Sequence, residues 1–227
     1  MNGEANAPSL IEIAYNGVKK DITEGHLLPG SKIIIRELSE RYKISGTPIK
    51  QALNRLVTEG LVESVPRRGM WVKKVSWPEI KDTLDFRLMM ELYFVETVIL
   101  TLDGNTEAQN RFTANISENL DYAKNSASLG EYQRVYRLDQ QFHRMYLECS
   151  GNRKVVQVYN NLNTHAYSTY LYEKQPREKT IEGVLEHQMI FDALCGGNAE
   201  KARSYLRLHS KNARAKIYYT LKATRSI

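Results

Sequence analysis

The chain has 227 residues, of which 42% are hydrophobic and 26% are charged, and its formal net charge at pH 7 is +6. This composition is ordinary for a soluble globular protein, and the length allows one large or two modest domains. Cys149 and Cys195 lie far apart without a CxxC pair, which argues against a disulfide scaffold and favours a reducing cytosol. The N-terminus lacks the basic start and apolar core of a secretory signal. The most apolar run contains Glu91 and Glu96, so we expect a buried helix and a cytoplasmic protein without a membrane span.

The basic charge is concentrated in the N-terminal third of the chain. Residues 1–76 hold 12 Lys and Arg against 8 Asp and Glu, whereas the rest of the chain holds 20 against 18. This balance permits a nucleic-acid partner without demonstrating one.

Three helices are expected in this third, over residues 10–24, 35–43 and 47–60. Ser45 or Thr47 can cap the start of the third helix. Two β-like segments, "LVESV" and "MWVKKV", follow it and are joined by "PRRG". Three helices and a hairpin within about 65 residues match a winged helix-turn-helix.

Such a domain binds DNA because the major groove admits one α-helix, whose N-terminal residues then face the base edges. Arg67 and Arg68 at the tip of the hairpin suit a contact to the DNA backbone or the minor groove. The competing interpretation is a small helical domain whose basic hairpin tip is simply solvated.

The pattern changes near Ser76. The sequence "SWPE" predicts a capping box, with Ser76 as the N-cap and Glu79 at the third helical position. Beyond it we expect only helices joined by short polar turns, as in an antiparallel bundle. The fold class is therefore mainly α, with a winged helix-turn-helix over residues 1–75 and an all-α domain over residues 76–227. The expected helices span residues 77–102, 106–127, 131–149, 153–173, 178–195 and 198–220.

Three histidines fall on the apolar stripes of three different helices of the second domain: His143, His187 and His209. Asp139 lies four residues before His143 and so shares its helix face. Burying the three stripes would bring one carboxylate and three imidazoles together, a set that suits zinc, nickel, iron or manganese. The alternative is that each histidine is a hydrogen-bonded core residue.

The stretch from "GHLLPGSKI" to "PRRGMWV" resembles the DNA-binding domain of GntR-type bacterial transcription regulators, through "LLPG", "ELSERYKIS", "TPIKQAL" and "EGLV". In that family an arginine commonly follows the serine, where this chain has Gly46, and Lys50 replaces a common arginine. A different or weaker operator preference is therefore expected, because a bidentate arginine contact to guanine is lost. The resemblance implies DNA-binding roles for Arg36, Thr47, Lys50 and Gly69, and the expected DNA contacts also include Ser45, Arg67 and Arg68.

Residues 77–220 resemble the FCD effector domain of the FadR-like branch of the same family. The resemblance implies a divalent metal ion, zinc before nickel, manganese or iron, held by Asp139, His143, His187 and His209. It also implies an effector carboxylate held by Arg87, for which the alternative role is an ion pair with Glu91. Polar pocket residues are expected at Asn163 and His165.

These features together predict a transcription regulator, and a repressor before an activator, that is not an enzyme. A homodimer would bind double-stranded operator DNA, and a small carboxylate metabolite would control that binding. Two alternatives remain open at this point, which are a regulator whose effector is the ion itself and a metal-dependent hydrolase.

Overall fold

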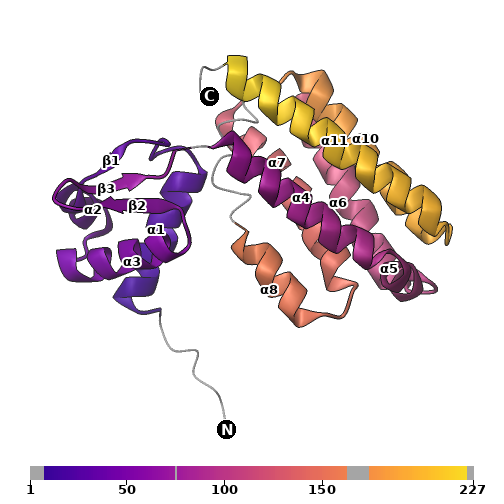
Figure 1. Ribbon diagram of the computed structural model, residues 1–227, viewed down its shortest axis with the longest axis horizontal. Coiled ribbons are helices and arrows are strands. Elements are labelled where there is room, and N and C mark those ends of the chain that lie inside the picture. The colour runs from indigo at the N-terminus through magenta and orange to yellow at the C-terminus, as the bar shows by residue number, and fades with distance from the viewer. Residues whose placement is uncertain (1–7, 75, 163–173, 224–227) are drawn as a thin grey trace, which may run out of the picture. The chain divides into compact units, whose positions relative to one another are not determined.

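The computed structural model describes residues 8–74, 76–162 and 174–223 (Figure 1). The chain divides into two compact units, Met1–Lys74 and Val75–Ile227. None of the helices in the described part of the chain is both long and apolar enough to cross a membrane.

The first unit contains three helices and a small antiparallel sheet, and this confirms the predicted winged helix-turn-helix (Figure 1). The sheet has the strand order β1 (Lys32–Ile33), β3 (Gly69–Val72), β2 (Val62–Val65). Val65 pairs with Gly69 at the hairpin end, and Lys32 pairs with Trp71 on the other side of β3. The short strand β1 was not predicted from the sequence. The elements are α1 (Leu10–Thr23), β1 (Lys32–Ile33), α2 (Ile35–Tyr42), α3 (Gly46–Thr58), β2 (Val62–Val65) and β3 (Gly69–Val72).

Helix α3 is held in place by its apolar stripe and by a polar contact at its C-terminal end. Its fully buried side chains Ile49, Leu53 and Leu56 belong to the core of this unit, and α1 packs against α3. Just past the end of α3, Glu59 accepts hydrogen bonds from the Tyr15 hydroxyl (2.7 Å) and the Lys19 ammonium (2.8 Å) of α1. The first turn of α3 is left at the surface by this packing.

The second unit is an antiparallel helical bundle, as predicted (Figure 1). Its helices are α4 (Trp77–Tyr93), α5 (Val95–Leu102), α6 (Thr106–Asn125), α7 (Leu129–Glu148), α8 (Arg153–Asn161), α10 (Arg177–Cys195) and α11 (Ala199–Ala223). The helix expected over residues 153–173 ends earlier than predicted, at Asn161, where Leu162 is the C-cap; residues 163–173 lie outside the described part of the chain.

Two local predictions in this unit were wrong. The single helix expected over residues 77–102 is broken at Phe94, which lets Val95, Val98 and Leu102 turn fully into the core. Ser76 occupies the N-cap position of α4, but its side chain makes no capping hydrogen bond. A complete capping box is found instead at Ser128 and Glu131, where the sequence suggested only a turn.

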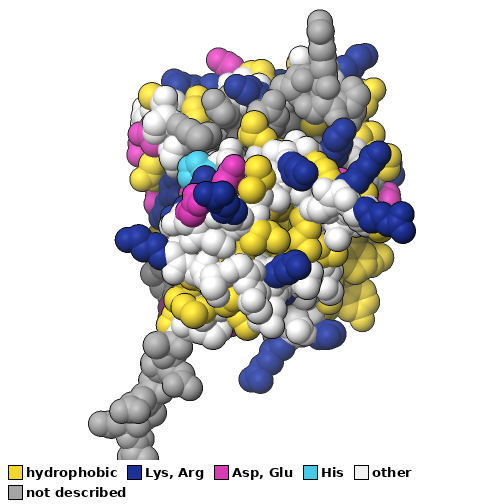
Figure 2. Space-filling model, turned by 90° about the vertical axis from the view of Figure 1, so that its left-hand side faces the viewer, with side chains coloured by type: hydrophobic (Ala, Val, Ile, Leu, Met, Phe, Trp, Pro, Cys, Tyr) yellow, Lys and Arg dark blue, Asp and Glu magenta, His cyan; other side chains and the backbone are white. Residues whose placement is uncertain are grey.

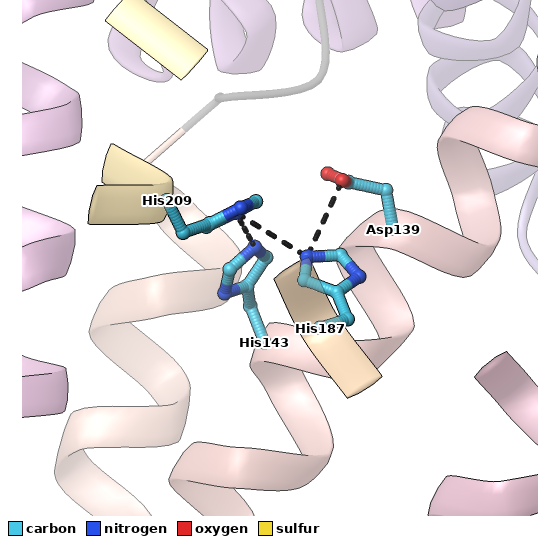
Figure 3. Close-up of side chains that lie close together, drawn as sticks. All are labelled: Asp139, His143, His187 and His209. Carbon is cyan, nitrogen blue, oxygen red and sulfur yellow. Dashed lines mark hydrogen bonds and ion pairs between the residues drawn. The ribbon is translucent and has the colours of Figure 1, made fainter. Parts of the chain in front are cut away.

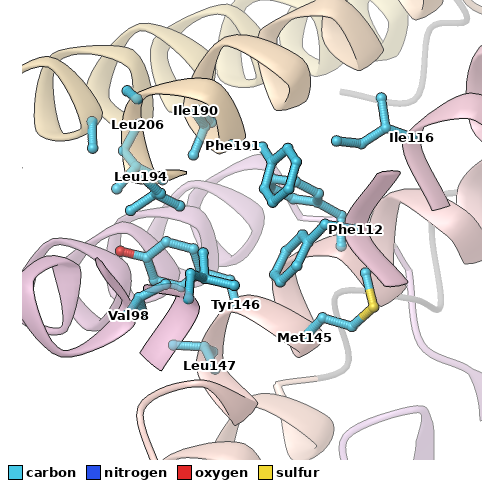
Figure 4. Packing of buried hydrophobic residues seen from close by; sticks show 14 of the residues in the cluster. Val98, Phe112, Ile116, Met145, Tyr146, Leu147, Ile190, Phe191, Leu194 and Leu206 are labelled. Carbon is cyan, nitrogen blue, oxygen red and sulfur yellow. The ribbon is translucent and has the colours of Figure 1, made fainter. Parts of the chain in front are cut away.

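Aromatic side chains from three helices form the centre of the bundle core (Figure 4). The Phe112 ring of α6 stacks on Phe191 of α10 at 5.2 Å and meets Phe142 of α7 edge-on at 5.5 Å. The Tyr146 hydroxyl donates a 2.8 Å hydrogen bond to the backbone carbonyl of Glu91 in α4. Phe142 directly precedes His143 in α7, and Tyr146 follows it by three residues. The packing of these two side chains therefore fixes the direction in which His143 points.

Candidate metal centre and nucleic-acid interface

Four side chains converge inside the bundle from α7, α10 and α11: Asp139, His143, His187 and His209 (Figure 3). Each offers one ligand atom, and these atoms all lie within 4.8 Å of one another. The Nε2 atom of His209 is 3.3 Å from Nε2 of His143 and 3.3 Å from Nε2 of His187, and Nε2 of His187 is 3.7 Å from Oδ1 of Asp139. The structure thus assembles the set of four residues that the sequence singled out.

The three imidazoles are almost completely buried, and their rings are fixed by packing. His187 stacks on Phe142 with the ring centres 4.0 Å apart and the planes nearly parallel. Burial pushes the pKa of His143 and of His187 well below the ordinary histidine value, and the positive charge of Arg87 lowers both further. Both rings are therefore neutral at pH 7 and keep one nitrogen lone pair for a ligand contact.

Two carboxylates orient the rings from behind. The Nδ1 atom of His143 lies 2.7 Å from Oε1 of Glu91 on α4, and Nδ1 of His209 lies 2.8 Å from Oε2 of Glu186 on α10. A carboxylate that accepts the Nδ1 proton leaves the Nε2 lone pair facing inward, and such pairs commonly support metal-binding histidines. The Nδ1 atom of His187 has no hydrogen-bond partner within the described ranges.

Sequence reasoning did not assign this orienting role to Glu91 or Glu186. Glu91 stands in the most apolar run of the chain, and a buried carboxylate there is itself a signal, because an unpaired charge in a core is strongly unfavourable. Glu186 directly precedes His187 in the sequence but contacts His209, a pairing that depends on how α10 packs against α11.

The donor atoms fit a divalent metal ion. Lone pairs on Nε2 atoms 3.3 Å apart repel one another unless a proton or a cation lies between them. Ligand atoms held around one ion by bonds of about 2.0–2.2 Å are separated by roughly 3–3.5 Å, close to the spacing of the three nitrogens. Three imidazoles and a carboxylate are a donor set that divalent transition metals favour.

Arg87 lies on α4 beside this centre. Its side chain is buried, and its Nε atom is 3.7 Å from Oε1 of Glu91, the same oxygen that contacts His143. Burial raises the pKa of Glu91, and the positive charge of Arg87 opposes that shift. The ion pair with Glu91, which was the alternative role for this arginine, is therefore present. Asn163 and His165, the other two expected pocket residues, lie outside the described part of the chain.

A cavity of about 570 Å³ opens between α10 and α11 at the edge of the centre. His209 and Glu186 form part of its wall, so the cavity borders the His209 ring on the side of its supporting carboxylate, whereas Asp139, His143 and His187 are not among its lining residues. A small molecule in this cavity would therefore contact the pair of His209 and Glu186.

The predicted DNA contacts of the first unit are at its surface. Ser45, Thr47 and Lys50 are exposed around the first turn of α3, and Ser45, the N-cap residue, makes no capping bond with its side chain. Gln51 and Asn54 are exposed on the same helix, and sequence reasoning named neither. On the face of the molecule shown in Figure 2, Lys and Arg side chains are spread singly among uncharged ones and outnumber acidic side chains.

The remaining predicted contacts lie on α2 and on the wing. Arg36 is exposed and pairs with Glu40 at 2.9 Å, an interaction that a phosphate can replace. Arg67 and Arg68 are exposed in the turn between β2 and β3. Arg67 has a φ of 62° and Gly69 a φ of 110°, so the turn places a non-glycine residue in the left-handed region.

Comparisons with known proteins agree with both units. Residues 10–72 match the family described as bacterial regulatory proteins, gntR family, and residues 82–212 match the FCD domain. The chain belongs to the GntR family of regulators that carry an FCD domain. It is a transcription regulator, and its relatives are regulators rather than enzymes.

Individual relatives of this GntR chain are distant. The HTH-type transcriptional regulator BphR of Paraburkholderia xenovorans is 26% identical over 213 residues, which cover 92% of this chain and 85% of BphR. The HTH-type transcriptional repressor GlaR of Escherichia coli is 27% identical, with 86% of this chain and 90% of GlaR covered. The E. coli McbR/YncC structure superposes with a TM-score of 0.77 at 20% identity, covering 94% of this chain and 99% of that one.

Removing ligands from the centre should remove the metal. We expect the purified chain to contain about one divalent ion per protomer, and His187→Ala or the pair His143→Ala with His209→Ala to contain almost none. Glu186→Gln keeps the four ligands but weakens the support of His209, so its metal affinity should fall by roughly 10–100-fold. Elemental analysis and chelator competition measure both quantities, with Glu182→Gln on the exposed side of α10 as the control. Wild-type protein purified without chelators that contains no metal would contradict the site.

The strained wing turn gives a second prediction. Arg67→Gly removes an unfavourable left-handed arginine, so the unfolding free energy of the first unit should rise by about 1 kcal/mol. If the arginine contacts a phosphate, the same change should weaken operator binding and reduce the salt slope by about 1. Thermal unfolding and fluorescence anisotropy at several salt concentrations test the two effects. Arg68→Ala, whose backbone is unstrained, should weaken DNA binding without the gain in stability, and unchanged affinity in both variants would remove the wing from the interface.

Proposed function

We propose that this protein is a one-component repressor that binds operator DNA as a homodimer and is controlled by a small carboxylate metabolite bound beside a metal ion. The observation that carries the proposal is the convergence of Asp139, His143, His187 and His209 within the FCD domain of a chain that also has a winged helix-turn-helix. The relative GlaR is a transcriptional repressor, which supports repression rather than activation as the mode of regulation. The site of action would be chromosomal DNA in the cytoplasm.

Zinc is the metal that we propose first, with nickel, manganese and iron as alternatives. Four protein ligands leave exchangeable positions on an ion that accepts six, so the bound ion would offer a Lewis-acidic position to a carboxylate oxygen. In the chain itself, Glu91 and Glu186 hold the histidines in place, and Arg87 adds a buried positive charge beside them. A guanidinium can bind a carboxylate through two parallel hydrogen bonds, so Arg87 would share its charge between Glu91 and the metabolite.

Helix α4 is the element through which the metabolite would act on DNA binding. It begins at Trp77, three residues after the end of the first unit at Lys74, and it carries both Arg87 and Glu91. It is also tied to α11, because Arg214 pairs with Asp85 at 2.6 Å and Ile80 and Leu84 pack with Leu221. A ligand that draws Arg87 away from Glu91 would change the position of α4. Such coupling requires the metabolite to bind one arrangement of the dimer more tightly than the other.

The exposed apolar face of α4 and α5 supports the homodimer. Phe86, Met89 and Tyr93 follow one another at positions i, i+3 and i+7 of α4 and are 39%, 57% and 77% exposed, and Leu100 of α5 is 74% exposed. Large apolar side chains gathered on one helix face commonly mark a protein interface. Helix-turn-helix dimers bind two half-sites about one helical turn of DNA apart, which gives the second copy a function.

The control of DNA binding can be tested directly. The metal-loaded chain is titrated onto an operator selected from a random duplex library, and anisotropy is read with and without a panel of small carboxylates. At least one carboxylate should weaken operator binding by about 5–150-fold, the usual range of coupling. His187→Ala should lose this response while it keeps operator binding in the absence of the carboxylate. An operator affinity that follows the metal concentration without any carboxylate would instead make the ion the effector.

The dimer interface has its own test. Met89→Glu places a charge in the centre of the exposed apolar face of α4, so we expect a shift from dimer to monomer in sedimentation velocity and a loss of operator affinity. Leu185→Glu on α10, also an exposed apolar position at 47%, is the matched control and should remain dimeric. A Met89→Glu variant that stays dimeric would move the interface elsewhere.

A further inference from the structure

Helix α3 carries a continuous row of uncharged polar side chains on the face that is turned away from the core of the first unit. These side chains are all exposed and follow one another at intervals of three or four residues, which places them on one side of a helix: Thr47, Gln51, Asn54 and Thr58. The fully buried side chains of α3 occupy the opposite side: Ile49, Ala52, Leu53 and Leu56. The polar row is therefore the centre of the surface that α3 presents to a partner.

The two amides of the polar row have no partner within the first unit. Among the described residues, no group forms a hydrogen bond or an ion pair with the side chain of Gln51 or of Asn54. The Thr58 hydroxyl, by contrast, already donates a 3.2 Å hydrogen bond to the backbone carbonyl of Asn54. A bound molecule would thus compete only with water for the two amides.

The arginine of α3 is engaged on another side of the helix. The guanidinium carbon of Arg55 lies 3.8 Å from the centre of the Tyr15 ring, and its Nε atom lies 3.5 Å from Oε1 of Glu59. These contacts hold Arg55 against α1, beside the polar row rather than in it. Arginine is the commonest reader of guanine in the major groove, so the middle of this helix face offers amides where a guanine contact would need a guanidinium.

The polar row has the length and the chemistry of a base-reading surface. A helix-turn-helix turns the N-terminal part of its second helix, here α3, toward base edges in the major groove, and residues 10–72 belong to the GntR family. Thr47 and Asn54 are separated by about 10 Å along the helix axis, roughly the length of three base pairs. An amide group combines a donor and an acceptor, and this pair matches N7 and N6 of adenine.

We propose that Gln51 and Asn54 each read an adenine, so that an operator half-site contains two A·T pairs close together. This inference deepens the DNA-binding part of the proposed function and is independent of the metal ion and the carboxylate. Lys50 lies at the side of the row, where its ammonium group can reach a phosphate or a guanine, and it is not needed for the adenine contacts. Gln51 and Asn54 are thus specificity-determining residues of the DNA interface.

The test is the selection of operators from a random duplex library by the full chain, without any carboxylate and at one salt concentration. The wild type should enrich half-sites that carry adenine at two positions within roughly three base pairs. The advantage of adenine over the other bases at each position, measured by fluorescence anisotropy, should be about 5–150-fold. Gln51→Ala should lose the advantage at one position only, and Asn54→Ala at the other.

Two further variants separate base reading from an effect on folding. Thr58→Ala is the matched control on the same row and should keep both adenines, because the Thr58 hydroxyl is bonded to the helix backbone. Gln51→Arg should change the selected base at its position from adenine to guanine. A variant that only impairs folding cannot produce such an exchange of preference.

The outcomes also separate this inference from metabolite control. Adenine preferences that persist in both alanine variants overturn it, because DNA shape or the wing would then select the A·T pairs. Wild-type half-sites without the two adenines overturn it as well. If the preferences follow the amides but no carboxylate weakens operator binding, the inference stands while the proposed metabolite control fails. If the chain enriches no duplex at all, operator recognition fails and the inference fails with it.

Discussion

The bundle depends on burying a cluster of three imidazoles in which Nε2 of His209 lies 3.3 Å from Nε2 of His143 and 3.3 Å from Nε2 of His187. Such a cluster is unfavourable by itself, because polar nitrogens lose water and their lone pairs repel. The structure offsets this with Glu91 and Glu186, each within 2.8 Å of a ring Nδ1 atom. Since Glu91 lies on α4, His143 on α7 and His209 on α11, one buried polar cluster links helices that are far apart in the sequence. A cation at its centre would complete the link.

That arrangement explains why the cluster suits a sensor better than a catalyst. A hydrolytic metal site needs a general base that can accept a proton from bound water. Here the buried carboxylates that approach the histidines are already engaged with ring nitrogens, and Glu91 also pairs with Arg87. These residues hold ligands in position, and the cavity beside them gives room for a small molecule. This arrangement supports the proposal of a binding site rather than a hydrolytic one, in a chain that belongs to a family of regulators.

The sequence predicted the elements more reliably than the contacts between them. The i, i+4 spacing places Asp139 and His143 on one helix face, so this pair follows from helix geometry alone. The meeting of that pair with His187 and His209 depends on how three helices pack, and the sequence pattern offered only a compatible stripe on each. The support from Glu186 to His209 runs across helices and has no local signal. Capping was misassigned too, because Ser76 has the sequence pattern of a capping box but makes no capping bond with its side chain, whereas Ser128 and Glu131 form both bonds.

The DNA-binding unit has a glycine, Gly46, at a position where an arginine was expected from the family resemblance. Gly46 begins α3, and a Cβ atom built there would meet only Ile35, at an ordinary contact distance of 3.6 Å. Its φ is not in the left-handed region, so neither crowding nor backbone strain requires glycine at this position. Folding therefore does not require a glycine at this position. In the proposed DNA interface, Lys50 and the exposed amides of Gln51 and Asn54 are the side chains of α3 that would read bases, and amide side chains of this kind pair best with adenine. If these side chains face the bases, the proposed interface predicts an operator richer in A·T pairs than one in which arginine reads guanine.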